Sequence, residues 1–401
     1  MNIIEERLDV PVRGDYDIII SGCGVAGISA AIAARRAGID KVLLLEKSFS
    51  LGGLATSGLI MLFEPLDDGT GDRVMDGLAL EFLKNATRYG ISTLDPQWRS
   101  FPKVGLESPR CMSVFSPTVF SLVLDDMLGK EKIDLILDSH VVNAMTDGNA
   151  VKAVIVENRE GRAAYSARMF IDATGDAVIL DRCKVPCRSG KSWLASICLK
   201  GSAESALKAA ETGDMLNLLQ WHNYGAKDNG KGHPDWFPVL EGGLSSEDVT
   251  RFMRGSRSLV FDAIKDEDPS SRDVIALPSV PQLRKTRRID GDYTVTESDF
   301  NLRHEDSIGV CGDYKYSGRW YEVPLGALFN RGCGNLLTCG RSISADGWAW
   351  DALREIPVCI MTGQAAGVAA ATAVMEGKSL PDTPIAGIQK NLEKQGVRLH
   401  K

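Results

Sequence analysis

The distribution of apolar and polar residues near the start of the chain predicts a strand, a tight turn, a helix and a second strand. Residues 18–20 form a short continuous apolar run, as in a strand buried within a parallel sheet. Residues 25–37 are small and mostly apolar, and they are followed by Gly38, a common residue just past a helix end. A further apolar run at residues 42–45 predicts a neighbouring parallel strand.

The rest of the chain divides into three stretches with different patterns. Up to about residue 180 strands and helices follow one another, residues 181–322 are mixed, and the end returns to a strand and a long apolar helix. Apolar residues at helical spacing predict helices at 76–89, 116–128, 202–221, 246–265 and 356–375. Short apolar runs predict strands at 134–137, 141–145, 151–156 and 165–173, with a hairpin turn at Asp147-Gly148.

The turn after the first strand has the pattern Gly-x-Gly-x-x-Gly, formed by Gly22, Gly24 and Gly27. In a dinucleotide-binding fold these glycines permit the tight turn, the close approach of a pyrophosphate and close packing of helix on strand. Glu46 ends the second strand about 20 residues later, where a carboxylate can bind a ribose. The alternative is that the glycines only make a turn and Glu46 is an ordinary exposed residue.

A second glycine pair, Gly52-Gly53, follows within the segment Leu51-Gly52-Gly53-Leu54-Ala55-Thr56. This combination resembles FAD-binding proteins of the glutathione-reductase type, whose chain passes the pyrophosphate and the flavin here. The chain as a whole resembles the FAD-dependent oxidoreductase family, which is distantly similar to the flavoprotein subunit of heterodisulfide reductase. The strand end Ala173-Thr174-Gly175-Asp176 is a further marker of the resemblance.

The C-terminal part carries the family's closing pattern. A strand ends in Gly340-Arg341, and a helix of small residues begins near Pro357, a residue that suits a first helical position. The resemblance implies that the positive end of this helix points at the flavin. Between strand and helix, Trp348 and Trp350 depart from the family pattern; they either form a stacking surface for a sugar or an aromatic ring, or they belong to the core.

The resemblance implies a Rossmann-like, three-layer α/β domain for FAD, formed by residues 1–180 and 323–401. Residues 181–322 are predicted to form an inserted α+β substrate domain. FAD is expected to be non-covalent, because residues 48–56 contain no His or Cys to attach it. The implied cofactor-binding residues are Gly22, Gly24, Val25, Ala26, Gly27, Glu46, Lys47, Gly52, Gly53, Leu54, Ala55, Thr56, Val142, Ala173, Thr174, Gly175, Gly340, Arg341, Asp346 and Pro357.

Composition argues against several classes of partner and metal site. A net charge of −7 over 401 residues argues against nucleic acid or an anionic membrane as the main partner. The start of the chain lacks the apolar segment of a secretory signal, and we expect no membrane span. Nine cysteines, an odd number, suggest reduced thiols and a cytoplasmic location. The absence of a Cys-x-x-Cys pair argues against a metal or iron–sulfur site.

A flavin enzyme that transfers a hydride also needs a group that moves the accompanying proton, and no motif identifies this group. Side chains able to do so or to bind a substrate are Arg287, His304, Tyr314, Tyr316, Tyr321 and Arg354. The arginine-rich segment 281–293 either holds a polar substrate or pairs with acidic residues and joins the domains. Cys359 lies in the first turn of the last long helix, where it is either a thiol of lowered pKa or a small packed residue.

The leading hypothesis is an FAD-dependent oxidoreductase that transfers a hydride between flavin N5 and a small polar organic substrate, either a carbohydrate or a carboxylic acid. One alternative is a flavin-binding protein that serves structure or electron transfer without its own substrate. Another is an NAD-dependent dehydrogenase, which explains residues 17–46 but not Gly52-Gly53 or the C-terminal pattern. NAD(P)H or another carrier would exchange electrons with the flavin, and a homo-oligomer is compatible with the sequence.

Overall fold

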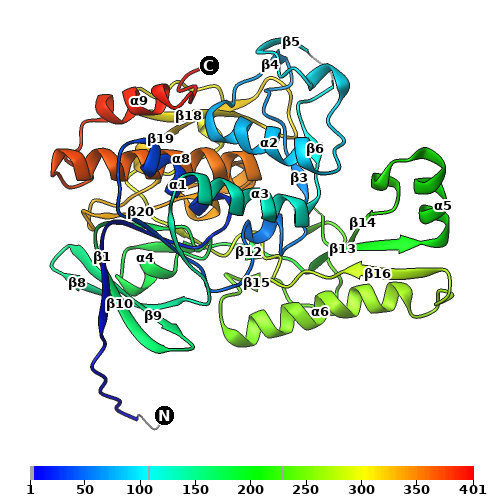
Figure 1. Cartoon of the computed structure of the whole chain (residues 1–401), viewed down its shortest axis with the longest axis horizontal. Helices are drawn as coiled ribbons and strands as arrows, with labels where there is room; N and C mark the ends of the chain where they lie inside the picture. The colour runs from blue at the N-terminus through cyan, green and yellow to red at the C-terminus, as the bar shows by residue number, and fades with distance from the viewer. Residues whose placement is uncertain (1–3, 107–108, 228–229) are drawn as a thin grey trace.

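A seven-stranded sheet forms the centre of the computed structural model, which describes residues 4–106, 109–227 and 230–401 (Figure 1). Its strand order is β7-β2-β1-β10-β9-β8, and β20 pairs with the end of β10. The pairs β7–β2, β2–β1, β1–β10 and β10–β20 are parallel, whereas β10–β9 and β9–β8 are antiparallel. The strands are β1 (Val12–Ser21), β2 (Val42–Leu45), β7 (Asp134–Ile136), β8 (His140–Asp147), β9 (Ala150–Asn158), β10 (Gly161–Asp172) and β20 (Leu336–Thr338).

Alternation along β1 distributes its residues between the two faces of this sheet. Ile18 and Ile20 pack in the core cluster that contains α1 (Val25–Arg36) and α8 (Ile356–Glu376). Ile19 packs in a second cluster with residues of β8–β10 and α4 (Val178–Arg182). The first half of β10 pairs with the β8–β9 hairpin, whose residues pack with Ile19 and α4 on the face opposite α1 and α8; this is the predicted three-layer α/β arrangement (Figure 1).

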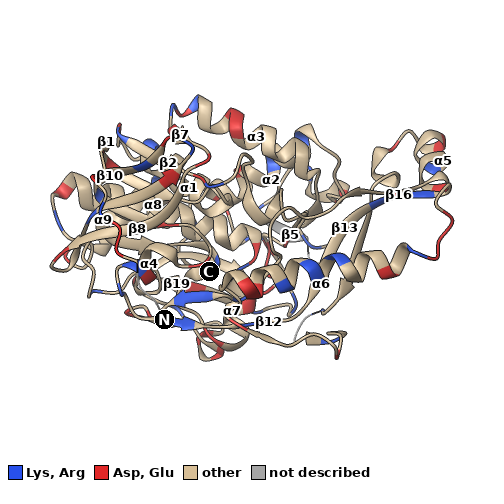
Figure 2. Cartoon of the chain, turned by 90° about the horizontal axis from the view of Figure 1, so that it is seen from below, with Lys and Arg blue, Asp and Glu red and all other residues tan. Residues whose placement is uncertain are grey.

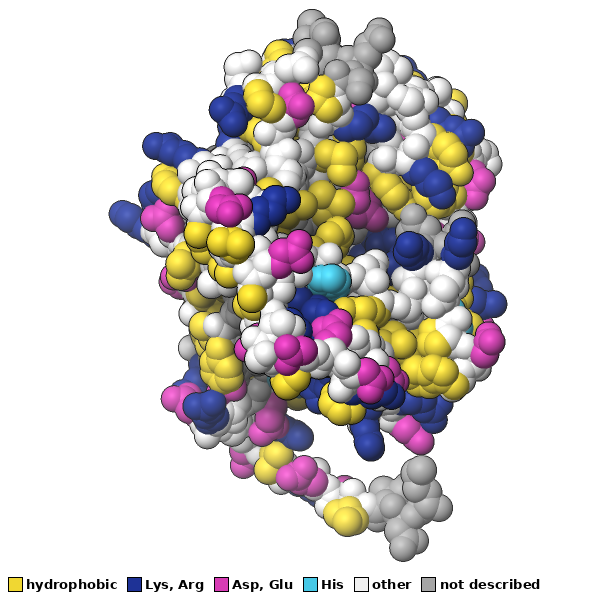
Figure 3. Space-filling view, turned by 90° about the vertical axis from the view of Figure 1, so that its right-hand side faces the viewer, with side chains coloured by type: hydrophobic (Ala, Val, Ile, Leu, Met, Phe, Trp, Pro, Cys, Tyr) yellow, Lys and Arg dark blue, Asp and Glu magenta, His cyan; other side chains and the backbone are white. Residues whose placement is uncertain are grey.

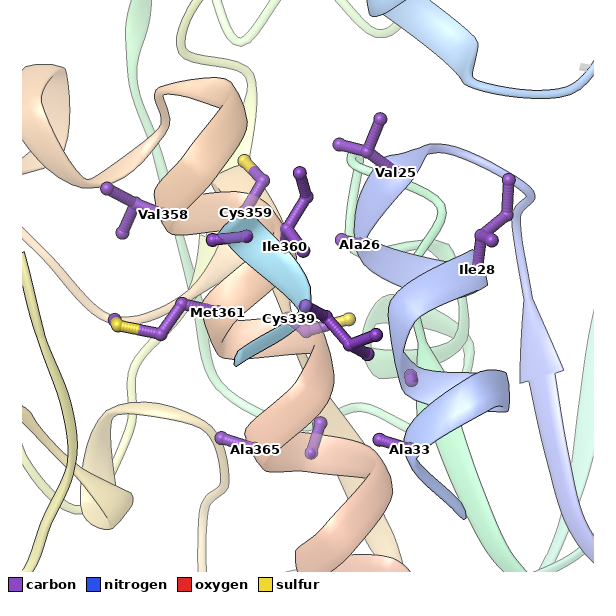
Figure 4. Packing of buried hydrophobic residues seen from close by; sticks show 14 of the residues in the cluster. Val25, Ala26, Ile28, Ala33, Cys339, Val358, Cys359, Ile360, Met361 and Ala365 are labelled. Carbon is purple, nitrogen blue, oxygen red and sulfur yellow. The ribbon is translucent and has the colours of Figure 1, made fainter. Parts of the chain in front are cut away.

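The helices α1 and α8 lie side by side and approach each other very closely (Figure 4). Two glycines of α8 make this possible: a Cβ on Gly363 would lie 2.1 Å from the Ala26 carbonyl oxygen, and one on Gly367 would lie 2.1 Å from that of Ala30. Among the described residues, α8 is the one helix long and apolar enough to cross a membrane, and 89% of its most apolar window is buried inside the protein.

Further helices and short sheets surround this core. Helices α2, α3 and α6 confirm three of the predicted helices. The helices are α2 (Gly77–Tyr89), α3 (Pro117–Lys130), α5 (Ala203–Thr212), α6 (Ser246–Ile264), α7 (Gly347–Leu353) and α9 (Ile385–Lys394). The 3-10 helices are η1 (Gly53–Ala55), η2 (Pro96–Trp98), η3 (Met215–Asn217), η5 (Glu297–Asp299), η6 (Leu325–Ala327) and η7 (Gly340–Ser342).

Short two-stranded sheets complete the chain. They pair β3 (Leu62–Phe63) with β6 (Ser113–Val114), β4 (Gly71–Asp72) with β5 (Val104–Leu106), β11 (Cys187–Ser189) with β17 (Arg287–Ile289), β12 (Lys191–Ser192) with β15 (Leu240–Glu241), and β18 (Ser307–Gly312) with β19 (Trp320–Pro324). The β18 strand packs against α8 and α9, although it precedes the predicted boundary at residue 323. The division into 1–180 with 323–401 and 181–322 stays a prediction.

A three-stranded antiparallel sheet projects to the right in Figure 1, with α5 and α6 beside it. Its order is β14 (Gln220–Gly225), β13 (Ala195–Ser202), β16 (Arg272–Ala276). The predicted single helix over 202–221 is wrong here, because α5 ends at Thr212 and Gly213 adopts a left-handed φ of 68°. Helix α6 lies along this lobe, and both basic and acidic positions occur along it (Figure 2).

Candidate active site

A cavity of about 420 Å³ runs from the carboxyl ends of β1 and β2 to the face of β13 and β14. Figure 3 views the molecule from the side of the β13–β14 lobe and shows hydrophobic and charged side chains interspersed on this face. Most of the residues predicted to bind the cofactor line the cavity. They are Gly22, Gly24, Val25, Ala26, Glu46, Lys47, Gly52, Gly53, Leu54, Ala55, Ala173, Thr174, Gly175, Gly340 and Arg341.

The first glycine turn is packed tightly on its inner side and open on the cavity side. Gly22 has a φ of +105°, and a Cβ there would lie 2.4 Å from the Ala173 carbonyl oxygen. A Cβ on Gly27 would lie 1.9 Å from the Gly22 carbonyl oxygen, so Gly27 packs the helix on the turn. A Cβ on Gly24, by contrast, would have no atom within 4 Å. The space in front of Gly24 therefore lies at the positive end of α1, where first-turn N–H groups favour an anion.

The second glycine pair lies directly beside the first turn. Gly24 and Gly52 form an isolated parallel bridge, and the Gly52 N–H donates to the Cys23 carbonyl at 2.8 Å. Both Gly52 and Gly53 have positive φ, and a Cβ on Gly53 would lie 3.1 Å from the Gly24 Cα. Two segments about 30 residues apart thus form one continuous backbone surface, as expected where a chain must approach phosphates closely.

Glu46 and Ser21 place polar side chains at the same end of the cavity. The Glu46 carboxylate is 8% exposed and accepts hydrogen bonds from the backbone N–H groups of Cys23 and Ser48, at 2.7 and 2.8 Å. The hydroxyl of Ser21 is buried and has no hydrogen-bond partner among the described residues. An open glycine turn, a fixed carboxylate and an unsatisfied hydroxyl fit the pyrophosphate and ribose of a dinucleotide.

Arg341 connects three segments that line the middle of the cavity. Its guanidinium donates to the carbonyl oxygens of Gly175, at 2.7 Å, and Leu283, and it forms an ion pair with Asp176 at 2.5 Å. Its side chain therefore holds the loop after β10 and the segment around Leu283 in place, besides lining the cavity itself.

The N-terminus of α8 reaches the cavity, as the resemblance implies. Ile356 and Cys359 line it, and Glu355 precedes the helix. Burial, together with the nearby Glu355 carboxylate, raises the pKa of the Cys359 thiol to about 12. This direction favours the alternative of a small packed residue at Cys359 over a thiol of lowered pKa, because desolvation disfavours the thiolate.

Residues 17–229 and 241–392 match the sequence pattern of the family described as FAD dependent oxidoreductase. The chain belongs to this family. This membership establishes FAD as the cofactor and an oxidoreductase as the class of enzyme, and it disfavours the NAD-dependent dehydrogenase alternative.

Two solved structures are similar to this FAD-dependent oxidoreductase, and the first of them has a similar fold. The p-nitrophenol 4-monooxygenase of Pseudomonas putida is 12% identical with a TM-score of 0.53, and the match covers 95% of this chain and 87% of that one. A geranylgeranyl bacteriochlorophyll reductase-like protein of Thermoplasma acidophilum is 13% identical with a TM-score of 0.45, covering 96% and 84%. No curated protein matches the chain. The first likeness confirms the Rossmann-like FAD-binding fold.

Five residues predicted to bind the cofactor do not line the cavity, each for a local reason. Gly27 is packed under the turn, and the Thr56 hydroxyl donates to the Leu51 carbonyl to fix the glycine loop. The Val142 carbonyl accepts from Arg182 at 3.0 Å, and the neighbouring residue Val141 lines the cavity instead. The remaining two lie at helix starts: Asp346 caps α7 with an exposed side chain, and Pro357 occupies the first turn of α8.

Of the candidate proton-transfer or substrate-binding groups, Arg354 and Tyr314 line the cavity. His304 lies away from it against Asp299, at 3.2 Å, and Arg287 pairs with Asp181. Tyr321 is fully buried in the core, and burial raises the pKa of its hydroxyl. Tyr316 lies 40% exposed on the surface. None of these four residues lines the cavity.

The arginine-rich segment lies partly at the cavity and partly beside acidic residues. Arg284 lines the cavity, whereas Arg287 and Arg288 lie near acidic residues of other segments. Trp350 is buried and donates to the Arg341 carbonyl at 2.8 Å. Trp348 packs on Tyr314, with ring centroids 5.5 Å apart, and neither tryptophan lines the cavity. Trp350 is thus a core residue, as one of the two alternatives held.

Sequence reasoning missed the far wall of the cavity. Ala195 and Ile197 of β13, Trp221 and Asn223 of β14, and residues 280–283 line it. Trp221 and Tyr224 are residue types enriched in strands, but the predicted helix over 202–221 includes the start of this segment and conceals the strand.

The raised pKa of Cys359 predicts an unreactive thiol in this oxidoreductase. At pH 8 a thiol of pKa about 12 is almost entirely protonated, and the thiolate is the nucleophile. We expect Cys359 to resist iodoacetamide at pH 8 in the folded protein and to react at the ordinary rate once urea exposes it. Mass spectrometry of the labelled peptides measures both rates; equal rates would contradict the raised pKa.

Proposed function

We propose that this oxidoreductase transfers a hydride between flavin N5 and a small polar organic substrate, for which a carbohydrate and a carboxylic acid are the two candidate classes. The observation that supports this proposal is the continuous cavity, which joins the glycine turns to the β13–β14 face and is also lined by Arg354 and Tyr314. The cofactor end and the β13–β14 face therefore belong to one cavity, so a substrate bound at that face would lie beside the cofactor.

The chain's own residues supply binding and orientation. Residues of the two glycine turns and Glu46 would hold the pyrophosphate and ribose, and Arg341 keeps the neighbouring loops in position. The N-terminus of α8 contributes a partial positive charge at the cavity, which favours a negatively charged group there. FAD itself supplies the hydride acceptor or donor when bound.

Arg354 favours a carboxylic acid over a carbohydrate. Its guanidinium lies 3.4 Å from both Asp351 and Glu355, and its side chain is 15% exposed. Asp351 is held more tightly by Lys285, at 2.7 Å. Burial disfavours the charge of Arg354, but the two carboxylates outweigh it and raise the pKa of the guanidinium. Glu355 lines the cavity as well, and a guanidinium has five N–H donors, so donors of Arg354 beyond those facing Asp351 and Glu355 would bind a substrate carboxylate.

Three further features of the hypothesis stay proposals. NAD(P)H or another carrier exchanges electrons with the flavin, the protein assembles as a homo-oligomer, and it works in the cytoplasm. The nine free cysteines support the cytoplasmic location, because they indicate a reducing compartment.

The first test is the visible spectrum of the purified protein, followed by anaerobic addition of carboxylic acids and sugars. We expect flavin absorption, release of FAD on denaturation, and bleaching by at least one member of the panel. A flavin that denaturation does not release would contradict non-covalent binding. A flavin that no carboxylic acid or sugar reduces, and that these ligands do not perturb, would favour the alternative of a protein without its own substrate.

Changing Arg354 to Gln tests the group that selects the substrate. Loss of charge-assisted hydrogen bonds should weaken the binding of a carboxylate ligand by about 10- to 100-fold, with FAD content unchanged. Ligand binding is measured from the shift of the flavin absorption bands. Arg303, which is exposed and pairs with Glu305, provides the control R303Q. Equal weakening for a carboxylate and for the corresponding neutral alcohol would contradict this role for Arg354.

A further inference from the structure

One end of the cavity has a largely apolar wall that the residues predicted for FAD do not supply. It is formed by Ile60, Leu62, Ala195, Ile197, Trp221 and Val280. These residues come from four separate segments of the chain. We propose, building on the function proposed above, that the substrate is an amphipathic organic acid whose apolar body, of the size of a ring or a branched chain, lies against this wall.

Strand alternation explains how the sheet presents this wall. Ala195 and Ile197 alternate along β13, and the antiparallel register pairs Ile197 with Asn223 and Leu199 with Trp221. Because side chains two residues apart share a face, Ala195, Ile197, Trp221 and Asn223 project from the same side. Ile197 is 7% exposed, whereas Trp221 is 37% exposed. A large part of the Trp221 side chain is therefore accessible to a bound molecule.

Gln282 fixes the wall relative to the cofactor end. Its side-chain amide donates to the Gly58 carbonyl at 2.6 Å and to the Ile197 carbonyl at 3.2 Å, and its oxygen accepts from the Ile197 N–H at 2.8 Å. Gly58 belongs to the loop that continues from Gly52-Gly53. A buried side chain thus joins β13 to the predicted flavin-binding loop, and the wall is held in position within the same cavity.

The chemistry of the wall separates the two substrate classes. A sugar pressed on aliphatic side chains would lose water from its hydroxyls without gaining hydrogen-bond partners, which costs free energy for each hydroxyl. An apolar body gains about fourfold in affinity for each methylene group that it buries. Trp348 and Trp350, for which a stacking surface for a sugar or an aromatic ring was one of two alternatives, do not line the cavity, whereas Trp221 lines it among aliphatic side chains. Arg354 and Tyr314 line it and provide for a polar head group, and Asn223 allows one polar substituent on the body.

A matched pair of ligands tests the proposal on the FAD-loaded enzyme. Cyclohexanecarboxylate and gluconate each carry one carboxylate, but one has an apolar ring and the other a polyhydroxylated chain. We expect cyclohexanecarboxylate to perturb the flavin absorption bands with a dissociation constant at least tenfold lower than that of gluconate. Equal or tighter binding of gluconate, or no perturbation by either ligand, would overturn the proposal.

Two variants test whether the preference for cyclohexanecarboxylate over gluconate comes from the apolar wall. W221A should reduce the preference for cyclohexanecarboxylate at least threefold, while the control W236A, at a tryptophan that is 59% exposed and does not line the cavity, should keep it. If the wall only covers the flavin, W221A will weaken FAD binding and leave the ligand preference unchanged, which also overturns the proposal. Released FAD is measured separately by its fluorescence.

Failure of the apolar-wall proposal can be distinguished from failure of the proposed hydride-transfer function. If sugars reduce the flavin anaerobically and gluconate binds more tightly, the enzyme has its own substrate but the apolar body is wrong. If no organic substrate reduces the flavin, while cyclohexanecarboxylate still binds tightly and W221A removes its preference, the binding wall is as proposed and the hydride-transfer function fails.

Discussion

Replacing Gly24 with valine should abolish FAD binding while the protein still folds. A Cβ at this position meets no protein atom within 4 Å, and the backbone of Gly24, with φ −66° and ψ 170°, is one that valine adopts readily. The added side chain would instead fill the space at the positive end of α1, where the cofactor's pyrophosphate is expected. We expect FAD affinity to fall at least about 100-fold, because several charge-assisted hydrogen bonds are lost.

The variant G22A serves as the comparison, because it should destabilise the fold, whereas G24V should affect FAD binding. Gly22 has a positive φ, and its Cβ would lie 2.4 Å from the Ala173 carbonyl oxygen, so alanine there strains the turn itself. Thermal unfolding of the FAD-free proteins should show a small change for G24V, about 1 kcal/mol at most from the helix N-terminus, and a large loss for G22A. A G24V protein that retains yellow, tightly bound FAD would show that the cofactor does not occupy this space.

The parts of the fold that the sequence predicts correctly are those in which chemistry and secondary structure are local. The segment from β1 to Gly58 contains an apolar run, glycines at characteristic spacing and Glu46. In a dinucleotide-binding fold each of these features has one structural role. The bridge between Gly24 and Gly52 follows from this order. Helix α8 was predictable for the same reason, since its small residues form one long apolar run.

Contacts between distant segments were not predictable in the same way. The segment before β14 has helical spacing, but Gly213 ends α5, and pairing with β13 then makes residues 220–225 a strand. His304 and Tyr321 carry suitable chemistry, yet tertiary packing places them against Asp299 and within the core. Side-chain type alone does not reveal which residues face a cavity, because the facing is decided by pairing register and by packing between segments.

The close contact between α1 and α8 predicts opposite effects for two glycine-to-alanine changes in helices. Gly363 of α8 lies so close to α1 that a Cβ would come 2.1 Å from the Ala26 carbonyl oxygen and 2.2 Å from the Ser29 hydroxyl. Backbone cannot move aside cheaply, and the Ser29 hydroxyl already donates to Ala26 and Ile360. G363A should therefore lower the free energy of unfolding by about 3 kcal/mol or more.

Gly129 of α3 is the matched control, because a Cβ there would meet no atom within 4 Å. G129A should raise the free energy of unfolding by about 0.5–1 kcal/mol, since alanine loses less backbone entropy in a helix than glycine. Urea unfolding followed by circular dichroism measures both changes. If G363A is as stable as the parent protein, the two helices do not pack as closely as described. Such a result would also mean that close packing against α1 does not hold the N-terminus of α8 beside the first glycine turn at the cavity.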